Sequence, residues 1–498
     1  DTVVFRPFSH PAGFVRLITK RRLTIAEAYI RLLSHAQNTG YTERIEALQV
    51  MMHHVWHAKN LSMPLNTARV QIALMKQAVR MRGNQRAQLE LMSDFARASY
   101  GKATVIRRLL RERDLIEVPE TGEDLCALDL GWDDHVHDSM TEGRKSPTQL
   151  VLDAFIKGIS RITVAYYDAT TPDTYEEIYL ASRILGIDVR IGIEFSIGKN
   201  LPPSRDLRSN PQGKTYEELS AYLAQNREKL TVFWKGLQCN SRHRHETVSA
   251  LLESFNRTGL VEFNAPYEGQ SHLQMAPLSW DDLEKLTPKS QATRVHLGQL
   301  IYQSMRPVAL KRVLYLKNLY RDMVENETRD VTVTWEEERC RRRYNEAVEE
   351  YEGSTMPPKM SPALCAQRYV TRNKEIDYDS SFATASDILP LLSSCGGEIV
   401  FIHPLSQGLV RGIETLFRDY ANITSIEVFN LVDALSRDTA EIRKFSTFLG
   451  ALSSESAEHV ASLLSEWNID SISIDQIKAL QAHVREKPFA MRASAPRG

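Results

Sequence analysis

Residues 134–147 read DHVHDSMTEGRKSP, and the stretches ITVAYYDAT at 162–170 and GIDVRIGIEFS at 186–196 follow them along the chain. An apolar segment precedes His135 and His137, so the pattern predicts that this pair lies at the end of a strand. Because side chains alternate across a strand, residues two apart lie on the same face. The spacing therefore places two imidazoles side by side.

Length and composition favour a folded chain of more than one domain. The chain has 498 residues, of which 42% are hydrophobic and 25% are charged. No apolar run approaches the roughly 20 residues that span a bilayer, and the first residues lack the plan of a signal peptide. From the start at Asp1 rather than Met, we expect a fragment or a processed form.

The five cysteines are scattered, and no Cys-x-x-Cys pair occurs. An odd, dispersed set argues against a disulfide framework, so we expect a reducing, cytoplasmic location. The sequence also shows no phosphate-cradling glycine loop and no nucleophilic Ser or Cys elbow.

Positive charge is concentrated in the first part of the chain. Residues 1–120 contain 19 Lys and Arg against 10 Asp and Glu, although the net charge of the whole chain is −1. This part also reads as helical, because a capping box at Thr24 and Glu27 opens one amphipathic segment. Further amphipathic segments lie at about 43–58, 66–82, 86–98 and 102–113. We therefore predict an all-α basic domain over residues 1–120.

Four arginines of this domain fall within two helical turns: Arg107, Arg108, Arg111 and Arg113. They could bind the phosphates of a nucleic acid, or they could form an ordinary solvated helix face. The domain could also serve as the contact with a protein partner. The sequence leaves these alternatives open.

After a polar, turn-rich linker at 117–125, the pattern of apolar and polar residues changes. Strand-like runs alternate with helix-like runs, which predicts parallel βα units that close into a barrel. The strand-like runs are RITVAYY, DVRIGIEF, KLTVFW, GEIVFIHP and ITSIEVFN. Between about 300 and 385 the alternation of strand-like and helix-like runs stops, and a charged stretch there predicts an exposed helical insertion. The fold class predicted is therefore α/β, with a distorted barrel domain over 121–498 that follows the all-α domain.

The order of these motifs resembles the polymerase and histidinol phosphatase (PHP) superfamily. The matching segments are HVHDSMTEGRKSP, AYYD, GIEFS, SRHRHETVSALLESFNRTG, ATRVHLGQLI, GGEIVFIHPL and SIEVFN, which span roughly residues 130–435. The branch that looks nearest is that of the nucleotide and RNA phosphoesterases. The resemblance implies a distorted βα barrel with up to three divalent metals at the carboxyl ends of its strands.

Such a metal centre suits phosphoester hydrolysis, because divalent ions acidify a bound water and neutralise the charge of the phosphate. Imidazole and carboxylate ligands suit zinc, manganese or iron. The resemblance implies four catalytic, metal-binding residues: His135, His137, Glu194 and His403. It also implies two further metal ligands: Glu142, in a Thr-Glu-Gly turn where the family has Ser-Asp-Gly, and Asp168, where the family has Thr-Asp-His-Asp.

The chain departs from the family pattern at three places. Tyr167 replaces a metal-binding His, and Tyr is a poor ligand because its ordinary pKa is near 10. Phe233, in the strand-like run KLTVFW, stands where relatives supply another His. The C-terminal segment ARASAPRG lacks the Asp-x-His element of the family. We therefore expect a reduced site that holds one divalent metal (Mn, Zn or Fe) or none.

Two functions follow from these matches and losses. The first is a metal-dependent phosphoesterase that acts on a nucleotide or nucleic-acid phosphate and binds it through Arg242, Arg244 or Arg294. The second is a catalytically inactive scaffold or regulatory protein that assembles with partners.

Overall fold

The computed structural model describes residues 28–30, 32, 40–56, 61–81, 84–120, 131–141, 143, 145–197, 205–287, 292–326, 335–352, 365, 368, 385–430, 434 and 439–494. The helix expected after Thr24 lies mostly outside these ranges. Among the described residues, no helix is long and apolar enough to cross a membrane.

A seven-stranded sheet forms the centre of the described structure, and its strands are arranged in the order in which they occur along the chain. The strands are β1 (Trp132–Val136), β2 (Arg161–Tyr166), β3 (Asp188–Ile197), β4 (Arg205–Asn210), β5 (Glu398–Ile402), β6 (Ser425–Asn430) and β7 (Ala490–Ser494). The first and last strands lie close to each other: the backbone N–H of Ala493 in β7 donates to Asp134 Oδ2 in β1 at 3.3 Å. The sheet is therefore nearly closed and barrel-like, as the fold prediction required.

One strand contradicts the expectation of parallel βα units. β4 is antiparallel to both β3 and β5, whereas the other neighbouring pairs are parallel. No helix separates β3 from β4 among the described residues, and the two strands run in opposite directions. The hairpin brings the end of β3 next to a strand that the sequence pattern did not reveal.

Local sequence signals bound the helices that follow β1 and β2. α7 (Pro147–Lys157) begins with a capping box between Ser146 and Gln149 and ends at Gly158, whose φ is 75°. α8 (Pro172–Leu185) begins with Pro at its first turn and ends at Gly186, with φ 64°. These two βα units place β1, β2 and β3 side by side with their carboxyl ends at one edge.

KLTVFW was expected to be a strand, and that prediction is wrong. The run lies in the first turns of α10 (Arg227–Ser254), a helix of 28 residues. Leu230, Phe233 and Leu237 are buried at spacings of three and four, so they form the inner face of a helix. Phe233 therefore packs edge-on against Phe195 of β3, with ring centroids 5.2 Å apart, and occupies no ligand position.

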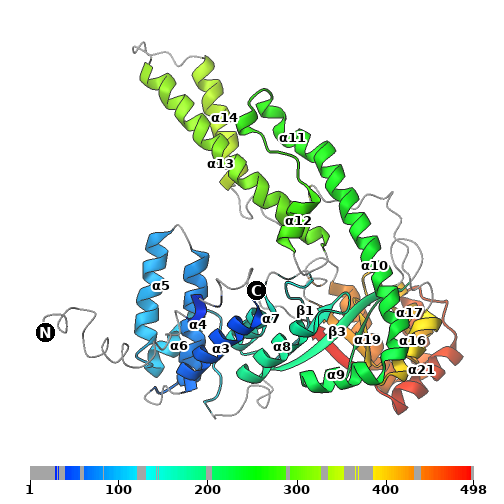
Figure 1. The fold of residues 1–498 in the computed structure, drawn as a ribbon. Coiled ribbons are helices and arrows are strands. Elements are labelled where there is room, and N and C mark those ends of the chain that lie inside the picture. Colours follow the sequence, from blue (N-terminus) through cyan, green and yellow to red (C-terminus); the bar gives the residue numbers. More distant parts are fainter. Residues whose placement is uncertain are drawn as a thin grey trace.

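All described elements between β4 and β5 are helical. They include α9 (Tyr216–Gln225), α10, the short π-helix Phe255–Gly259, α11 (Leu260–Asn264), α12 (Trp280–Leu286), α13 (Arg294–Asn326), α14 (Trp335–Glu352) and α16 (Ala385–Ser394). Figure 1 shows α10 running away from the sheet and α11 to α14 lying beyond it as an arm. The arm has its own buried apolar cluster, which includes Phe255, Leu283 and Leu297.

The first part of the chain packs against α7 and α8. It contains α3 (Tyr41–Trp56), α4 (Pro64–Arg80), α5 (Gln85–Ala98) and α6 (Ala103–Glu112), close to the predicted helical segments. Arg44 of α3 forms a two-pronged ion pair with Glu177 of α8, and the fully buried Arg69 of α4 donates to the carbonyls of Phe155 and Ile156 at the end of α7. α3 and α4 share one apolar core with the sheet, whereas α5 and α6 pack with part of α4 in a separate apolar cluster.

The arginine cluster of α6 contacts acidic side chains. Arg107 pairs with Glu117, Arg108 with Glu112, and Arg113 with Asp94. This pairing favours a solvated helix face over a phosphate-binding role.

The other described helices lie beside the later strands of the sheet (Figure 1). They are α17 (Leu409–Asp419), α19 (Thr439–Ser454), α20 (Ala457–Glu466) and α21 (Ile474–Glu486).

Candidate metal centre

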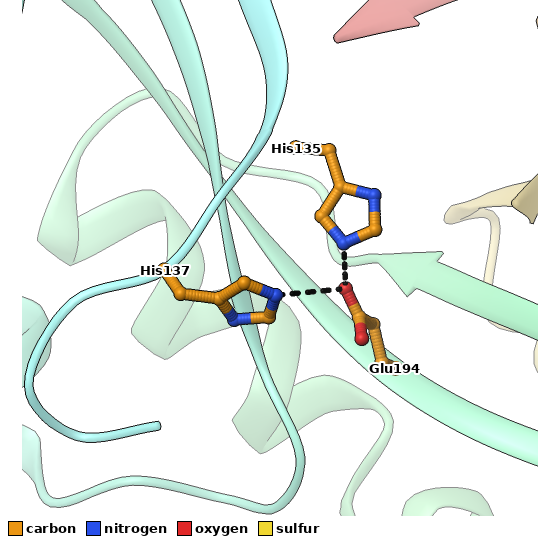
Figure 2. A group of neighbouring side chains, drawn as sticks. All are labelled: His135, His137 and Glu194. Atoms are coloured by element: carbon orange, nitrogen blue, oxygen red, sulfur yellow. Dashed lines mark ion pairs between the residues drawn. The ribbon is translucent and has the colours of Figure 1, made fainter. Parts of the chain in front are cut away.

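The ends of β1 and β3 bring two imidazoles to one carboxylate. His135 Nε2 lies 2.5 Å from Glu194 Oε1, and His137 Nε2 lies 3.7 Å from the same oxygen. Figure 2 shows both rings directed at Glu194. The strand-end prediction for His135 and His137 is thus matched by their positions at the end of β1 and just after it.

The hydrogen bonds of the two rings assign their tautomers. His135 Nδ1 lies 3.2 Å from Glu427 Oε1, and His137 Nδ1 lies 3.0 Å from the carbonyl oxygen of Ala165. Because a carboxylate or carbonyl oxygen only accepts, each Nδ1 carries the proton and donates it. In the neutral rings, each Nε2 therefore presents its lone pair toward Glu194.

Glu427, on β6, is a site residue that the sequence reasoning missed. Its carboxylate accepts from His135 Nδ1 and, at 2.9 Å, from the backbone N–H of His403. Asn430 also donates to it at 3.2 Å. The signal was present, since Glu427 lies in the Glu-Val-x-Asn element of the resemblance, within the strand-like run ITSIEVFN.

His403 follows β5 and adopts a left-handed backbone conformation, with φ 46°. Such a conformation is uncommon for a residue other than Gly and is a feature of constrained functional sites. Its ring centroid lies 5.0 Å from that of His135, and its Nδ1 lies 3.7 Å from Glu427 Oε2. Of the four residues expected to be catalytic, the structure therefore brings His135, His137, Glu194 and His403 into one cluster.

Charge and burial act in opposite directions on the clustered groups. Burial disfavours protonation of His135, but the carboxylates of Glu194 and Glu427 outweigh it and raise the pKa of His135 to about 10. Burial likewise disfavours ionisation of Glu194, but His135 and His137 hold its pKa far below the ordinary range. In the metal-free protein, a charged imidazole therefore lies between two carboxylates.

The residues present fit a divalent cation. His135, His137 and Glu194 each offer one ligand atom, and these atoms lie within 4.8 Å of one another. Although His135 Nε2 is so close, Glu194 Oε1 is buried and accepts no hydrogen bond of good geometry from the described residues. Two imidazoles and one carboxylate, with further positions left for water or substrate, form a typical catalytic zinc or iron ligand set.

A second possible ligand group consists of His135, His403 and Glu427. His135 cannot serve both groups as a neutral ligand, because its Nδ1 carries the proton whenever Nε2 presents a lone pair. Glu427 therefore acts as the carboxylate that orients His135, an arrangement common around metal-bound histidines.

An aromatic ring and an arginine flank the centre on the side of His137. The ring of Tyr167 lies 5.5 Å from that of His137, and the guanidinium carbon of Arg244 lies 4.3 Å from the centre of the Tyr167 ring. Arg244 comes from α10, so the helix that leads into the arm also reaches the site. Asp168 is half-buried beside them, and burial raises the pKa of its carboxyl against the effect of Arg244. Asp168 belongs to neither ligand group.

The other predicted site residues are placed less centrally. Arg242 is exposed on α10, and Arg294 is exposed at the first residue of α13. Glu142 lies outside the described residues.

Comparisons with known proteins add little to this picture. No family model matches the chain, and no curated protein matches it. A solved structure of a candidate metal-dependent phosphoesterase from Bifidobacterium adolescentis is similar at 12% sequence identity and a TM-score of 0.37, over 74% of this chain and 91% of that chain. A likeness this weak does not define the activity of the present protein.

Proposed function

We propose that the chain is a divergent PHP-like phosphoesterase that uses one divalent metal to hydrolyse a nucleotide or nucleic-acid phosphate. One observation carries the proposal: two imidazoles, each with its Nδ1 beside a hydrogen-bond acceptor, direct their Nε2 atoms at one buried carboxylate oxygen. The resemblance of the surrounding motifs supplies the reaction class.

His135, His137 and Glu194 would hold the metal. When bound, a divalent ion at such a site lowers the pKa of a water ligand and neutralises charge on the phosphate. Glu427 keeps the ring of His135 in its ligating orientation. His403 lies beside this ring and is partly exposed, so its imidazole is available to exchange a proton with the substrate or with water.

Arg244 is the favoured phosphate-binding residue of the three arginines. It is the one whose position beside Tyr167 and His137 is fixed by a described contact. A guanidinium can make two parallel hydrogen bonds to a phosphate. The ring of Tyr167 would then limit the orientations that this guanidinium can adopt.

The test is a hydrolysis assay with purified, metal-free chain to which Mn²⁺, Zn²⁺ or Fe²⁺ is returned. Nucleotide monophosphates, a dinucleotide and a 3′-phosphorylated oligonucleotide serve as substrates. We expect phosphate release that depends on added metal and falls at least 100-fold in His137→Ala, because one of three ligands is lost. The exposed His459 of α20 provides the matched control, His459→Ala, which should retain the wild-type rate. An unaltered rate in His137→Ala would contradict the proposal.

The alternative of an inactive scaffold is favoured by one specific observation. His135 is held between Glu194 and Glu427 at 2.5 and 3.2 Å, so the metal-free cluster already pairs its central charge internally. A protein of that kind would keep this network for stability and bind partners through other surfaces. Elemental analysis of the purified chain separates the two: a stoichiometric metal supports the enzyme, and a metal content of zero even after incubation with Mn²⁺ supports the scaffold.

A further inference from the structure

An exposed histidine of α10 packs against a tryptophan of the arm, directly after Arg244 in the sequence. The ring centroids of His245 and Trp280 lie 4.0 Å apart, and the ring planes are tilted by 57°. Consecutive Cα atoms are about 3.8 Å apart, so His245 begins beside the arginine whose guanidinium lies over the ring of Tyr167. The aromatic pair is therefore a close neighbour of the residues that flank the candidate metal centre.

Trp280 is a fixed support for this histidine. It is the first residue of α12, which begins with a capping box between Ser279 and Asp282. Its Nε1 donates to Glu284 Oε1 at 3.0 Å, and its side chain packs against the apolar cluster of the arm. Figure 1 shows α12 at the end of the arm that lies toward the sheet. The indole is thus held in one position at the base of the arm.

The imidazole that rests on this support is open to solvent. His245 is exposed, whereas Trp280 is partly buried. The neighbouring His243 is also partly buried and lies 3.6 Å from Glu246, so it presents less free ring surface. Nucleobases stack on exposed aromatic side chains, histidine included, because every base has a flat π-face. The pair of His245 and Trp280 therefore has the chemistry of a base-stacking surface.

The place of this surface relative to Arg244 suits a nucleotide. Consecutive side chains leave a helix about 100° apart, so Arg244 reaches Tyr167 while His245 reaches Trp280. A charged group for a phosphate and a flat ring for a base thus lie next to each other. A nucleotide carries its phosphate and its base on one ribose, so it can contact both groups at once.

We propose that His245, supported by Trp280, stacks on the nucleobase next to the hydrolysed phosphate, so that the site prefers nucleotides and oligonucleotides to phosphoesters without a base. This inference rests on the proposed function, because it concerns the substrate of the same site. It goes beyond that function by naming the side chains that recognise the base. If the pair only joined α10 to α12, its loss would affect substrates with and without a base equally.

The experiment measures kcat/KM for substrates that differ only in the base. Adenosine 5′-monophosphate (AMP) is compared with ribose 5-phosphate, and a 3′-phosphorylated oligonucleotide with a counterpart whose last nucleotide lacks its base. His245→Leu removes the aromatic ring, and His245→Phe keeps one. We expect the ratio of kcat/KM with base to that without base to fall about 5- to 20-fold in His245→Leu, within the range for the loss of one base–aromatic stack. His245→Phe should keep this ratio within twofold of the wild type.

The arm offers a matched control. His272 is another exposed histidine of the arm, and its ring centroid lies 5.6 Å from that of Tyr315. His272→Leu therefore removes a similar ring contact elsewhere and should leave the ratio of the wild type. Equal losses for both kinds of substrate in His245→Leu would overturn the proposal while leaving the phosphoesterase intact. A fall of the ratio in His272→Leu as large as in His245→Leu would overturn it as well.

Binding without turnover separates this proposal from the proposed function. Metal-free protein is titrated with AMP and with ribose 5-phosphate, and tryptophan fluorescence is recorded. We expect AMP to bind at least fivefold more tightly than ribose 5-phosphate in the wild type and to lose this advantage in His245→Leu. Trp280→Phe should remove most of the AMP-dependent quenching, although the chain has six tryptophans. A wild type without preference for AMP would overturn the proposal. If the wild type hydrolysed none of the substrates, the phosphoesterase would fall, whereas an AMP preference that depends on His245 would still support the base-stacking surface.

Discussion

His135 Nδ1 on β1 lies 3.2 Å from Glu427 Oε1 on β6, so a hydrogen bond between residues 292 positions apart orients the imidazole at the centre of the site. The opposite nitrogen of the same ring lies 2.5 Å from Glu194. A carboxylate behind a ligating histidine fixes its tautomer and increases its basicity. The metal affinity of the site should therefore depend on a residue that does not touch the metal.

Glu427→Ala should weaken Mn²⁺ binding about 10- to 100-fold, the usual effect of losing such a carboxylate. Calorimetric titration of the metal-free protein gives the affinity. Glu458, an exposed glutamate of α20 that pairs with Lys478, provides the control, because it belongs to neither possible ligand group. Equal affinities of wild type and Glu427→Ala would show that His135 does not need this partner.

Without metal, stability should fall as the pH rises above neutrality. The pKa of His135 is raised from 6.5 to about 10 in the folded state, so its contribution is fully present below pH 6.5 and is lost as the pH rises through 10. We expect the free energy of unfolding to decrease by on the order of a few kcal/mol over this window. Urea unfolding of metal-free protein at pH 6.5, 8 and 9.5 measures it. His135→Gln should flatten the dependence, and a wild-type stability that rises over this window would contradict the charged His135.

The sequence reveals those parts of the barrel whose strands are apolar. β2 and β3 read as strands because parallel strands covered on both faces are nearly continuous apolar runs. β4, with the sequence RDLRSN, has no such pattern, because its inward side chains Arg208 and Asn210 face a charged interior. The alternation of apolar and polar residues cannot reveal a strand whose buried face is polar.

For KLTVFW, the sequence pattern predicts a strand where the structure has a helix. Six residues rich in β-branched and aromatic side chains favour a strand locally, yet the helical spacing extends well beyond them through α10. At the site, the four residues selected by motif order lie in one cluster: His135, His137, Glu194 and His403. Glu427 could not be assigned from spacing, because its partner His135 is brought to it only by the near closure of the sheet.

The loop after His137 has no room for a side chain at Gly143. A Cβ there would lie 2.2 Å from the carbonyl oxygen of His137 and 2.7 Å from the carbonyl carbon of Asp138, and backbone atoms cannot move aside as a flexible side chain can. Gly143→Ala should therefore lower stability by about 2 kcal/mol or more and weaken metal binding with it. Thermal unfolding and Mn²⁺ titration measure the two effects.

Gly450 offers the matched control for Gly143. It lies on the exposed side of α19, and a Cβ there would meet nothing within 4 Å. Gly450→Ala should raise stability by about 0.5–1 kcal/mol, because alanine loses less conformational freedom in a helix. If both substitutions changed stability in the same direction and by the same amount, the close contact inferred at Gly143 would be contradicted.

The ion pair between Arg44 and Glu177 should contribute strongly to the attachment of the first helices. Both side chains are more than 90% buried, and Thr148 also donates to Glu177 at 2.7 Å. Arg44→Met leaves a buried carboxylate without its cation, which should cost about 3 kcal/mol or more. The exposed pair of Arg86 and Glu90 gives the comparison, since Arg86→Met should leave the unfolding midpoint nearly unchanged. Similar small losses in both variants would argue against this docking of α3 on α8.

Arg244 and Arg242 lie two residues apart on α10 and should differ sharply in their effect on hydrolysis. Residues so spaced point away from each other on a helix, and Arg244 is the one that stacks on Tyr167 beside the centre. A lost hydrogen bond to a charged phosphate costs about 1.5–3 kcal/mol, so Arg244→Ala should lower kcat/KM about 10- to 150-fold. Metal stoichiometry should remain that of the wild type, because Arg244 does not hold the metal. Arg242→Ala, on the exposed side, should leave kcat/KM within twofold of the wild type. A larger loss in Arg242→Ala than in Arg244→Ala would mean that the phosphate approaches from the outer face of the arm, and the role assigned to Tyr167 and Arg244 would then be wrong.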